Sequence, residues 1–204
     1  TGEVNVDNAT LTTDGPNSGN GYRIGQQGTG TLNVTGGGLV QIANDTSGGI
    51  ADFDLGVVAG ASGTLNISGA GSSVIAEDAL IGNGGVGTVM VSAGGLFDQS
   101  IFTSPDAFVG LQSGAAGNVT VTGPAFLSSA GAPGDAGSGT LDVLAGGAVD
   151  ASGLLTIGDV DGGSGIVTVN GSGASDSRLD VGDILTVGNG GQGTLNIAAG
   201  SVVD

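Results

Sequence analysis

One short acidic turn contains the residue types that bind a hard cation. Residues 158–163 read GDVDGG, which places Asp159 and Asp161 around a sharp turn. Carboxylate oxygens are preferred ligands of Ca²⁺, although the bidentate Glu that closes a complete calcium loop is absent here. Further carboxylates follow one repeat later, at Asp176, Asp180 and Asp183. The favoured interpretation is a solvated acidic turn, and a calcium site at Asp159 and Asp161 is the alternative.

Residues for acid–base catalysis are few. Enzymes that cleave acidic polysaccharides need a basic residue or carboxylates held at a fixed separation. The chain has no His and no Lys, and its two cations, Arg23 and Arg178, are distant in sequence. Asp52 and Asp54 alternate onto one side without a partner base and, with Asn44 and Asp45, form only a weaker cation candidate. We therefore expect no enzymatic activity, and a polysaccharide-active enzyme is the less favoured alternative.

Aromatic side chains are scarce and concentrated in one stretch. Four of the five Phe lie together in the sequence, at Phe97, Phe102, Phe108 and Phe126. They lie near one of two expected inserted loops, at about 43–54 and 98–107, and loops on a rigid scaffold commonly carry binding function. The favoured interpretation is that these Phe residues fill a widened part of the core. The alternative is that they form an adhesive or subunit contact.

Composition and charge exclude several classes of protein. Gly accounts for 46 of the 204 residues, Cys is absent, and 19 acidic residues give a net charge of −17. Nucleic acids and anionic membranes would repel such a chain, so we expect neither as a partner. No apolar run reaches the length of a membrane-spanning helix, which excludes direct membrane insertion. These features favour an extracellular protein.

An internal repeat predicts the elements that position these residues. A Gly-x-[Leu/Val]-x-[Val/Ile] motif recurs about every 27 residues. It starts at residues 2, 30, 63, 87, 117, 139, 165 and 193. An aliphatic-Gly pair precedes most copies but is missing from residues 123–138, and a Gly-rich turn with a short apolar piece follows. Each repeat thus predicts three short strands separated by turns.

The alternation within each motif predicts how the repeats stack. In GTLNV at 30–34, Leu32 and Val34 point to one side, while Thr31 and Asn33 point to the other. One such strand cannot bury its apolar side alone, but coiled repeats bury it in continuous ladders. We therefore predict one all-β domain over residues 1–204, a parallel β-helix (β-solenoid) of about eight rungs with three strands each.

The repeat resembles that of bacterial autotransporter (type V secretion) and PEP-CTERM-associated surface proteins. Residues 185–197 (LTVGNGGQGTLNI) and 80–95 (LIGNGGVGTVMVSAGG) match the pattern best, and the similarity covers nearly the whole chain. The resemblance implies a structural or adhesive module on the bacterial cell surface or secreted from it, with no catalytic residue. A calcium-stabilised surface-layer protein is the alternative, and a surface or host ligand is a further expected partner.

The first and last copies of the motif are predicted to expose ladder residues. They belong to the outermost rungs, where Val4 and Val6 at one end and Leu195 and Ile197 at the other lack a further rung to cover them. An uncovered strand also presents unpaired N–H and C=O groups. We therefore expect end-to-end contacts, either with neighbouring rungs of a longer solenoid or between separate copies in a filament.

Overall fold

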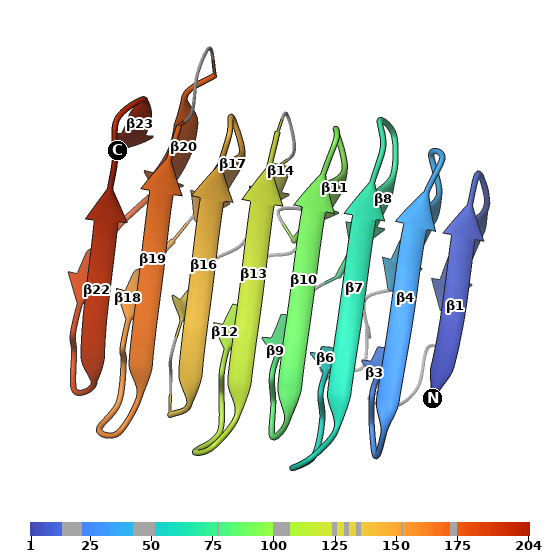
Figure 1. Cartoon of the computed structure of the whole chain (residues 1–204), viewed down its shortest axis with the longest axis horizontal. Helices are drawn as coiled ribbons and strands as arrows, with labels where there is room; N and C mark the ends of the chain where they lie inside the picture. The colour runs from blue at the N-terminus through green and yellow to red at the C-terminus, as the bar shows by residue number, and fades with distance from the viewer. Residues whose placement is uncertain are drawn as a thin grey trace.

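The computed structural model confirms an all-β architecture. It describes residues 1–13, 22–42, 52–76, 78–99, 107–123, 126–128, 131–133, 136–151, 153–171 and 175–204, with only the backbone for residues 13, 52, 126–128 and 131–133. Every regular element in these ranges is a β-strand. The strands form three parallel sheets, and the chain passes through the sheets in turn, which is the predicted β-solenoid (Figure 1).

Each sheet collects one strand from successive rungs of the described chain. Sheet A holds β1 (Gly2–Asp7), β4 (Thr29–Thr35), β7 (Ser62–Ser68), β10 (Val86–Ser92), β13 (Ala116–Thr122), β16 (Ser138–Leu144), β19 (Ser164–Asn170) and β22 (Gln192–Ile197). Sheet B holds β2 (Thr10–Thr13), β5 (Leu39–Ile42), β8 (Ser73–Ile75), β11 (Leu96–Asp98), β14 (Phe126–Ser128), β17 (Ala148–Ala151), β20 (Ser177–Val181) and β23 (Ser201–Val203). Sheet C holds β3 (Tyr22–Ile24), β6 (Asp52–Leu55), β9 (Asp78–Ile81), β12 (Ala107–Val109), β15 (Gly131–Pro133), β18 (Leu155–Ile157) and β21 (Leu185–Val187).

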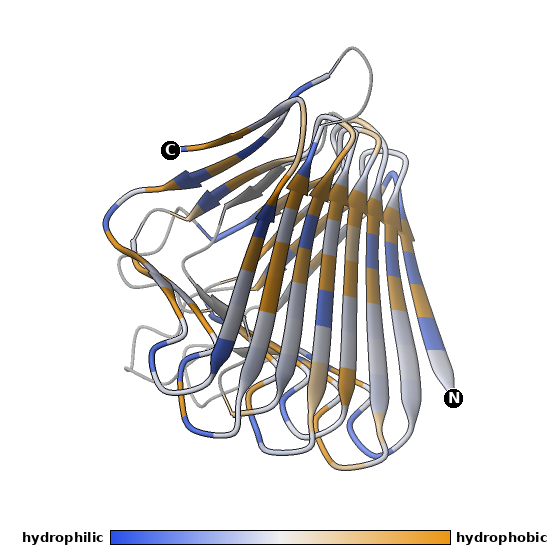
Figure 2. Ribbon diagram, turned by 60° about the vertical axis from the view of Figure 1, so that its left-hand side comes forward, coloured by the Kyte–Doolittle hydropathy of each residue, from blue (hydrophilic) through white to orange (hydrophobic). Residues whose placement is uncertain are grey.

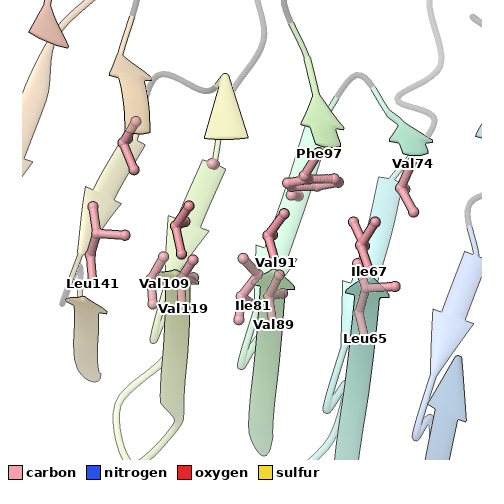
Figure 3. Packing of buried hydrophobic residues seen from close by; sticks show 14 of the residues in the cluster. Leu65, Ile67, Val74, Ile81, Val89, Val91, Phe97, Val109, Val119 and Leu141 are labelled. Atoms are coloured by element: carbon pink, nitrogen blue, oxygen red, sulfur yellow. The ribbon is translucent and has the colours of Figure 1, made fainter. Parts of the chain in front are cut away.

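The repeated motif sets the register of sheet A. Its Gly residues pair with one another from rung to rung, as Gly30 does with Gly63, and the residues that follow them remain in step. The inward positions of β7, Leu65 and Ile67, are fully buried. They stack against the corresponding residues of neighbouring rungs in a core that all three sheets line (Figure 3). Figure 2 shows the resulting alternation of hydrophobic and hydrophilic bands across sheet A.

Glycine is required where sheet C turns into sheet A. Gly56, directly after β6, has φ +64, and a Cβ built on it would lie 2.2 Å from the carbonyl oxygen of Val86 in the next rung. The motif glycine Gly63 faces inward, and a Cβ there would lie 2.1 Å from the carbonyl oxygen of Ile24. The backbones of adjacent rungs therefore approach too closely at this corner for a side chain, which explains the paired glycines of each repeat.

The stretch without an aliphatic-Gly pair still contributes a strand to sheet C. In β15, Pro133 takes the place of the aliphatic residue and pairs in register with Val109 of β12. Towards the next rung, the register with β18 contains only the pair Gly131 and Leu155. Proline has no N–H to donate, which accounts for a shorter ladder at this position.

The connections differ most in length at the corner between sheets B and C. Residues 14–21, 43–51 and 99–106 join β2 to β3, β5 to β6 and β11 to β12, whereas residues 76 and 77 suffice between β8 and β9. The two loops expected from the repeat spacing fall at this corner. Most of their residues lie outside the described part of the chain.

Candidate functional site

The predicted calcium residues lie in the turn between β18 and β19. Asp161 is exposed, whereas Asp159 is half-buried and accepts a hydrogen bond of 2.8 Å from Asn189 Nδ2 in the next rung. A depression of about 350 Å³ beside the turn is lined by Asp161 together with residues 162–164 and 190–192. Within the described ranges, no three His, Cys, Asp or Glu side chains come together in a metal-binding group. Calcium binding here remains a prediction from the sequence pattern.

The more distant carboxylates of this region have other surroundings. Asp180 is bound by the guanidinium of Arg178, which also lies 3.9 Å from Asp204 Oδ2. Asp176 and Asp183 are both exposed. Asp180 therefore pairs with Arg178 within strand β20 of sheet B, and not with the turn that holds Asp159.

The described structure places a buried carboxylate in sheet C at Asp54. This residue is 3% exposed, and its Oδ2 lies 3.5 Å from Nε of Arg23, its in-register partner on β3. On the other side, Asn83 Nδ2 donates to Asp54 Oδ1 over 3.5 Å, and Asn83 Oδ1 accepts a 2.8 Å hydrogen bond from Gln112 Nε2. Burial raises the pKa of the Asp54 carboxyl above its ordinary value, and the charge of Arg23 opposes that shift.

The weaker cation site predicted from the sequence is only partly described by the structure. Asn44 and Asp45 lie outside the described residues, and Asp52 is described only by its backbone in β6. The structure therefore places Asp54 alone among these four side chains. The polar chain from Arg23 through Asp54 and Asn83 to Gln112 was not predicted, because its members come from four different repeats at positions that the motif leaves variable.

The phenylalanine residues do not form one exposed contact. Phe97 is fully buried and its ring packs against that of Phe53, with centroids 6.2 Å apart. The adhesive contact is therefore wrong for Phe97, and the core-filling interpretation is confirmed for it, because this side chain fills the core between sheets B and C. Phe108 is half-buried in β12, and the backbone of Phe126 lies in β14 of sheet B. Phe102 lies outside the described residues.

The ladder residues at the two ends differ in exposure. Val4 is 47% exposed and Ile197 is 55% exposed, as expected for outermost strands. Leu195 is half-buried, whereas Val6 is only 5% exposed and belongs to the core. The strands that carry them, β1 and β22, occupy the two edges of sheet A. The expected exposure of the outermost ladder residues is therefore confirmed at Val4 and Ile197, but not at Val6.

The outward side of sheet A carries a polar side-chain ladder that sequence reasoning did not single out as a site. Asn66 Nδ2 donates to Asn33 Oδ1 over 2.8 Å, and Asn33 Nδ2 donates to Asn5 Oδ1 over 2.7 Å. Farther along, Thr140 donates to Asn118 Oδ1 over 2.8 Å. The outward Asn and Thr positions of the motif were visible in the sequence. Their mutual hydrogen bonds depend on the in-register stacking that the structure shows.

Comparisons with known proteins give one relative. No family model and no solved structure matches the chain. Over 156 residues, or 72% of its length, the chain is 33% identical to the uncharacterized lipoprotein YdeK of Escherichia coli (strain K12). The chain spans 11% of the length of that relative.

The part of the chain that the structure describes contains no helix long and apolar enough to cross a bilayer.

Proposed function

We propose that the chain is a structural module of the bacterial cell surface, a β-solenoid spacer that presents an adhesive side. The observation that carries this proposal is the uninterrupted in-register stack of sheet A, in which eight strands of the described chain pair one after another. Such a stack extends by adding rungs, and each rung depends mainly on its neighbours. The fold therefore suits a function of spacing and display.

Similarity to a lipoprotein supports a location at the cell envelope. The relative is named a lipoprotein and is far longer than the matched region, which suits a solenoid segment within a larger envelope protein. The resemblance to autotransporter and PEP-CTERM-associated repeats points in the same direction, towards export and surface display. A chain with a charge of −17 is also suited to remaining soluble outside the cell.

Surface display is tested on the source bacterium with an antibody raised against the solenoid. We expect the antibody to label intact cells, and a protease added outside the cells to remove the signal while a cytoplasmic marker remains. Labelling only after the cells are broken open would contradict the proposal. A fraction that leaves with the culture medium would indicate secretion instead of anchoring.

Calcium stabilisation is a second candidate, favoured by the position of Asp159 and Asp161 in one turn beside a depression. An ion that binds only the folded chain raises its melting temperature by mass action. We expect EDTA to lower the melting temperature of calcium-loaded protein, and Asp161→Asn to abolish that difference. Equal melting with and without EDTA would remove calcium from the proposal. Cleaved product from a uronate polymer would favour the polysaccharide-active enzyme.

A further inference from the structure

The outward side of four successive strands forms a flat surface without charge. We propose that this surface, the outward side of β4, β7, β10 and β13 and here named the neutral face, binds a neutral, hydroxyl-rich polysaccharide. The inference rests on the surface location proposed above, since that location would bring the face into contact with extracellular glycans. In Figure 1 these strands are the long arrows of sheet A between β1 and β16.

The distribution of charge selects the class of ligand. The chain carries 19 acidic residues, yet none occurs in the strands of the neutral face. The acidic residues of sheet A lie to either side, Glu3 and Asp7 in β1 and Asp142 in β16. A polyanion would be repelled by the protein as a whole. A neutral polymer meets no such barrier at this face.

Side-chain chemistry matches a hydroxyl-rich partner. Apart from Val86, Met90 and Ala116, the outward residues of these strands all carry a hydroxyl or an amide group. Amides and hydroxyls both donate and accept hydrogen bonds, as sugar hydroxyls do. Protein partners are usually anchored by aromatic or Arg side chains, and the neutral face contains neither. The face is therefore better suited to a glycan than to a protein.

The neutral face is already ordered before any ligand arrives. Asn66 is hydrogen-bonded to Asn33, and Ser92 Oγ donates to Ser68 Oγ over 3.2 Å. The in-register strands hold such rows about 4.8 Å apart along the solenoid. Asn66 retains one N–H for a ligand and Asn33 Oδ1 retains one lone pair, whereas both N–H groups of Asn33 are taken by Asn5 and Glu3. Because these side chains are held in place, binding costs less conformational entropy than on a mobile surface.

The neutral face is open to solvent at its centre. Met90 and Val86 of β10 are 45% and 43% exposed, so no other described segment covers this strand. Their apolar side chains can contact the C–H faces of sugar rings, and Met adapts easily to irregular surfaces. A face that is open to solvent in this way suits a polymer that lies across several rungs. Each hydrogen bond to the ligand takes the place of a hydrogen bond to water, so its net contribution to the binding free energy is small. Binding therefore depends on many simultaneous contacts.

Sedimentation with microcrystalline cellulose, a flat and neutral glucan, tests the proposal on the purified chain. We expect saturable retention of the wild type, and at least a tenfold lower apparent affinity for the double variant Thr64→Asp with Thr88→Asp, in β7 and β10. The matched control is Gln41→Asp with Ser73→Asp, on the outward side of the adjacent strands β5 and β8 in sheet B. This control adds the same charge and should bind within twofold of the wild type. Circular dichroism melts confirm that each variant is folded.

Three results would overturn the assignment. These are no retention of the wild type, equal loss in both double variants, or equal retention on cellulose and on beads carrying polygalacturonate. A dimer that forms with concentration and is lost only in Thr64→Asp with Thr88→Asp would assign the face to a second copy. Failure of cellulose binding leaves the antibody labelling of intact cells unaffected, so the two proposals fail separately.

Discussion

At the scale of the residue, Asp54 is the most deeply buried carboxylate among the side chains that the structure describes. It is 3% exposed, and burial raises its pKa although Arg23 lies 3.5 Å away. When the folded pKa of an acid exceeds its unfolded value, the folded state binds the proton more tightly. The resulting stability is fully present below the unfolded pKa, about 3.9 for Asp, and is lost as pH rises through the folded pKa.

We therefore expect Asp54→Asn to gain stability relative to the wild type at neutral pH, and this gain to disappear in acid. The substitution keeps the shape of the side chain and removes the buried charge. Thermal melts of both proteins across pH 3–8 provide the measurement. Asp183→Asn removes the same charge from an exposed position between β20 and β21 and serves as the control. A constant difference between Asp54→Asn and the wild type across this range would contradict the expectation.

Glycine can be required at a corner because of its positive φ or because the backbone of the next rung lies too close for a side chain. Substitutions of Gly56 and Gly60 distinguish these two causes. Both have positive φ, but a Cβ on Gly56 meets the carbonyl of Val86, whereas a Cβ on Gly60 meets open space. We expect Gly60→Ala to cost about 1–2 kcal/mol for the left-handed conformation. Gly56→Ala should cost about 1–3 kcal/mol more, because the rungs must also separate. Denaturant midpoints measure both, and equal losses would show that the close approach relaxes freely.

At the scale of the element, the Asn ladder of sheet A links separate repeats. Asn33 donates to Asn5 and to Glu3 Oε1, and accepts from Asn66. Asn33→Asp replaces the donor with a charged acceptor that faces Glu3, so we expect a loss of about 1 kcal/mol. Part of that loss should be recovered at acidic pH. Asn196→Asp, at the same motif position in the edge strand β22, is the control. Equal destabilisation by the two substitutions would exclude the ladder as the cause.

The strands and their order could be predicted because the motif repeats. Gly, Leu and Val at fixed spacing determine which side of each strand is buried, and the stacking of Leu32 on Leu65 follows directly. Strand β15 was not predicted, since Pro133 replaces the aliphatic residue that marks the other copies. The burial of Phe97 agrees with the favoured core-filling interpretation, although the sequence pattern alone also allowed a surface contact. Only the neighbouring Phe53 decides that question.

The contacts of the candidate sites were largely beyond sequence reasoning. Asp159 and Asn189 lie thirty positions apart, and their hydrogen bond requires the exact register of successive rungs. The same holds for Arg23, Asp54 and Asn83, which meet only because β3, β6 and the turn after β9 stack. Variable positions acquire partners from the repeats above and below them. A single repeat therefore shows which residues point outward but gives no indication of what they contact.

At the scale of the whole molecule, the outermost strands of sheet A determine how copies can meet. Each of β1 and β22 has a neighbour on one side only, and Val4 and Ile197 are about half exposed there. Parallel strands with free edges can pair with another chain, and a head-to-tail contact of this kind does not close on itself. We therefore expect the purified chain to form species that grow with concentration.

This expectation is tested by light scattering across a concentration series. Ile197→Asp places a charge in the open ladder of β22, so it should shift the distribution towards monomer. The control is Ile166→Asp in β19, a strand with a neighbour on both sides. The Ile166 side chain is 40% exposed, so this substitution adds the same charge and should leave the association unchanged. The two variants separate edge pairing from general repulsion, since both raise the net negative charge equally. A wild type that stays monomeric at every concentration, or an equal response of both variants, would show that the edges of sheet A do not pair.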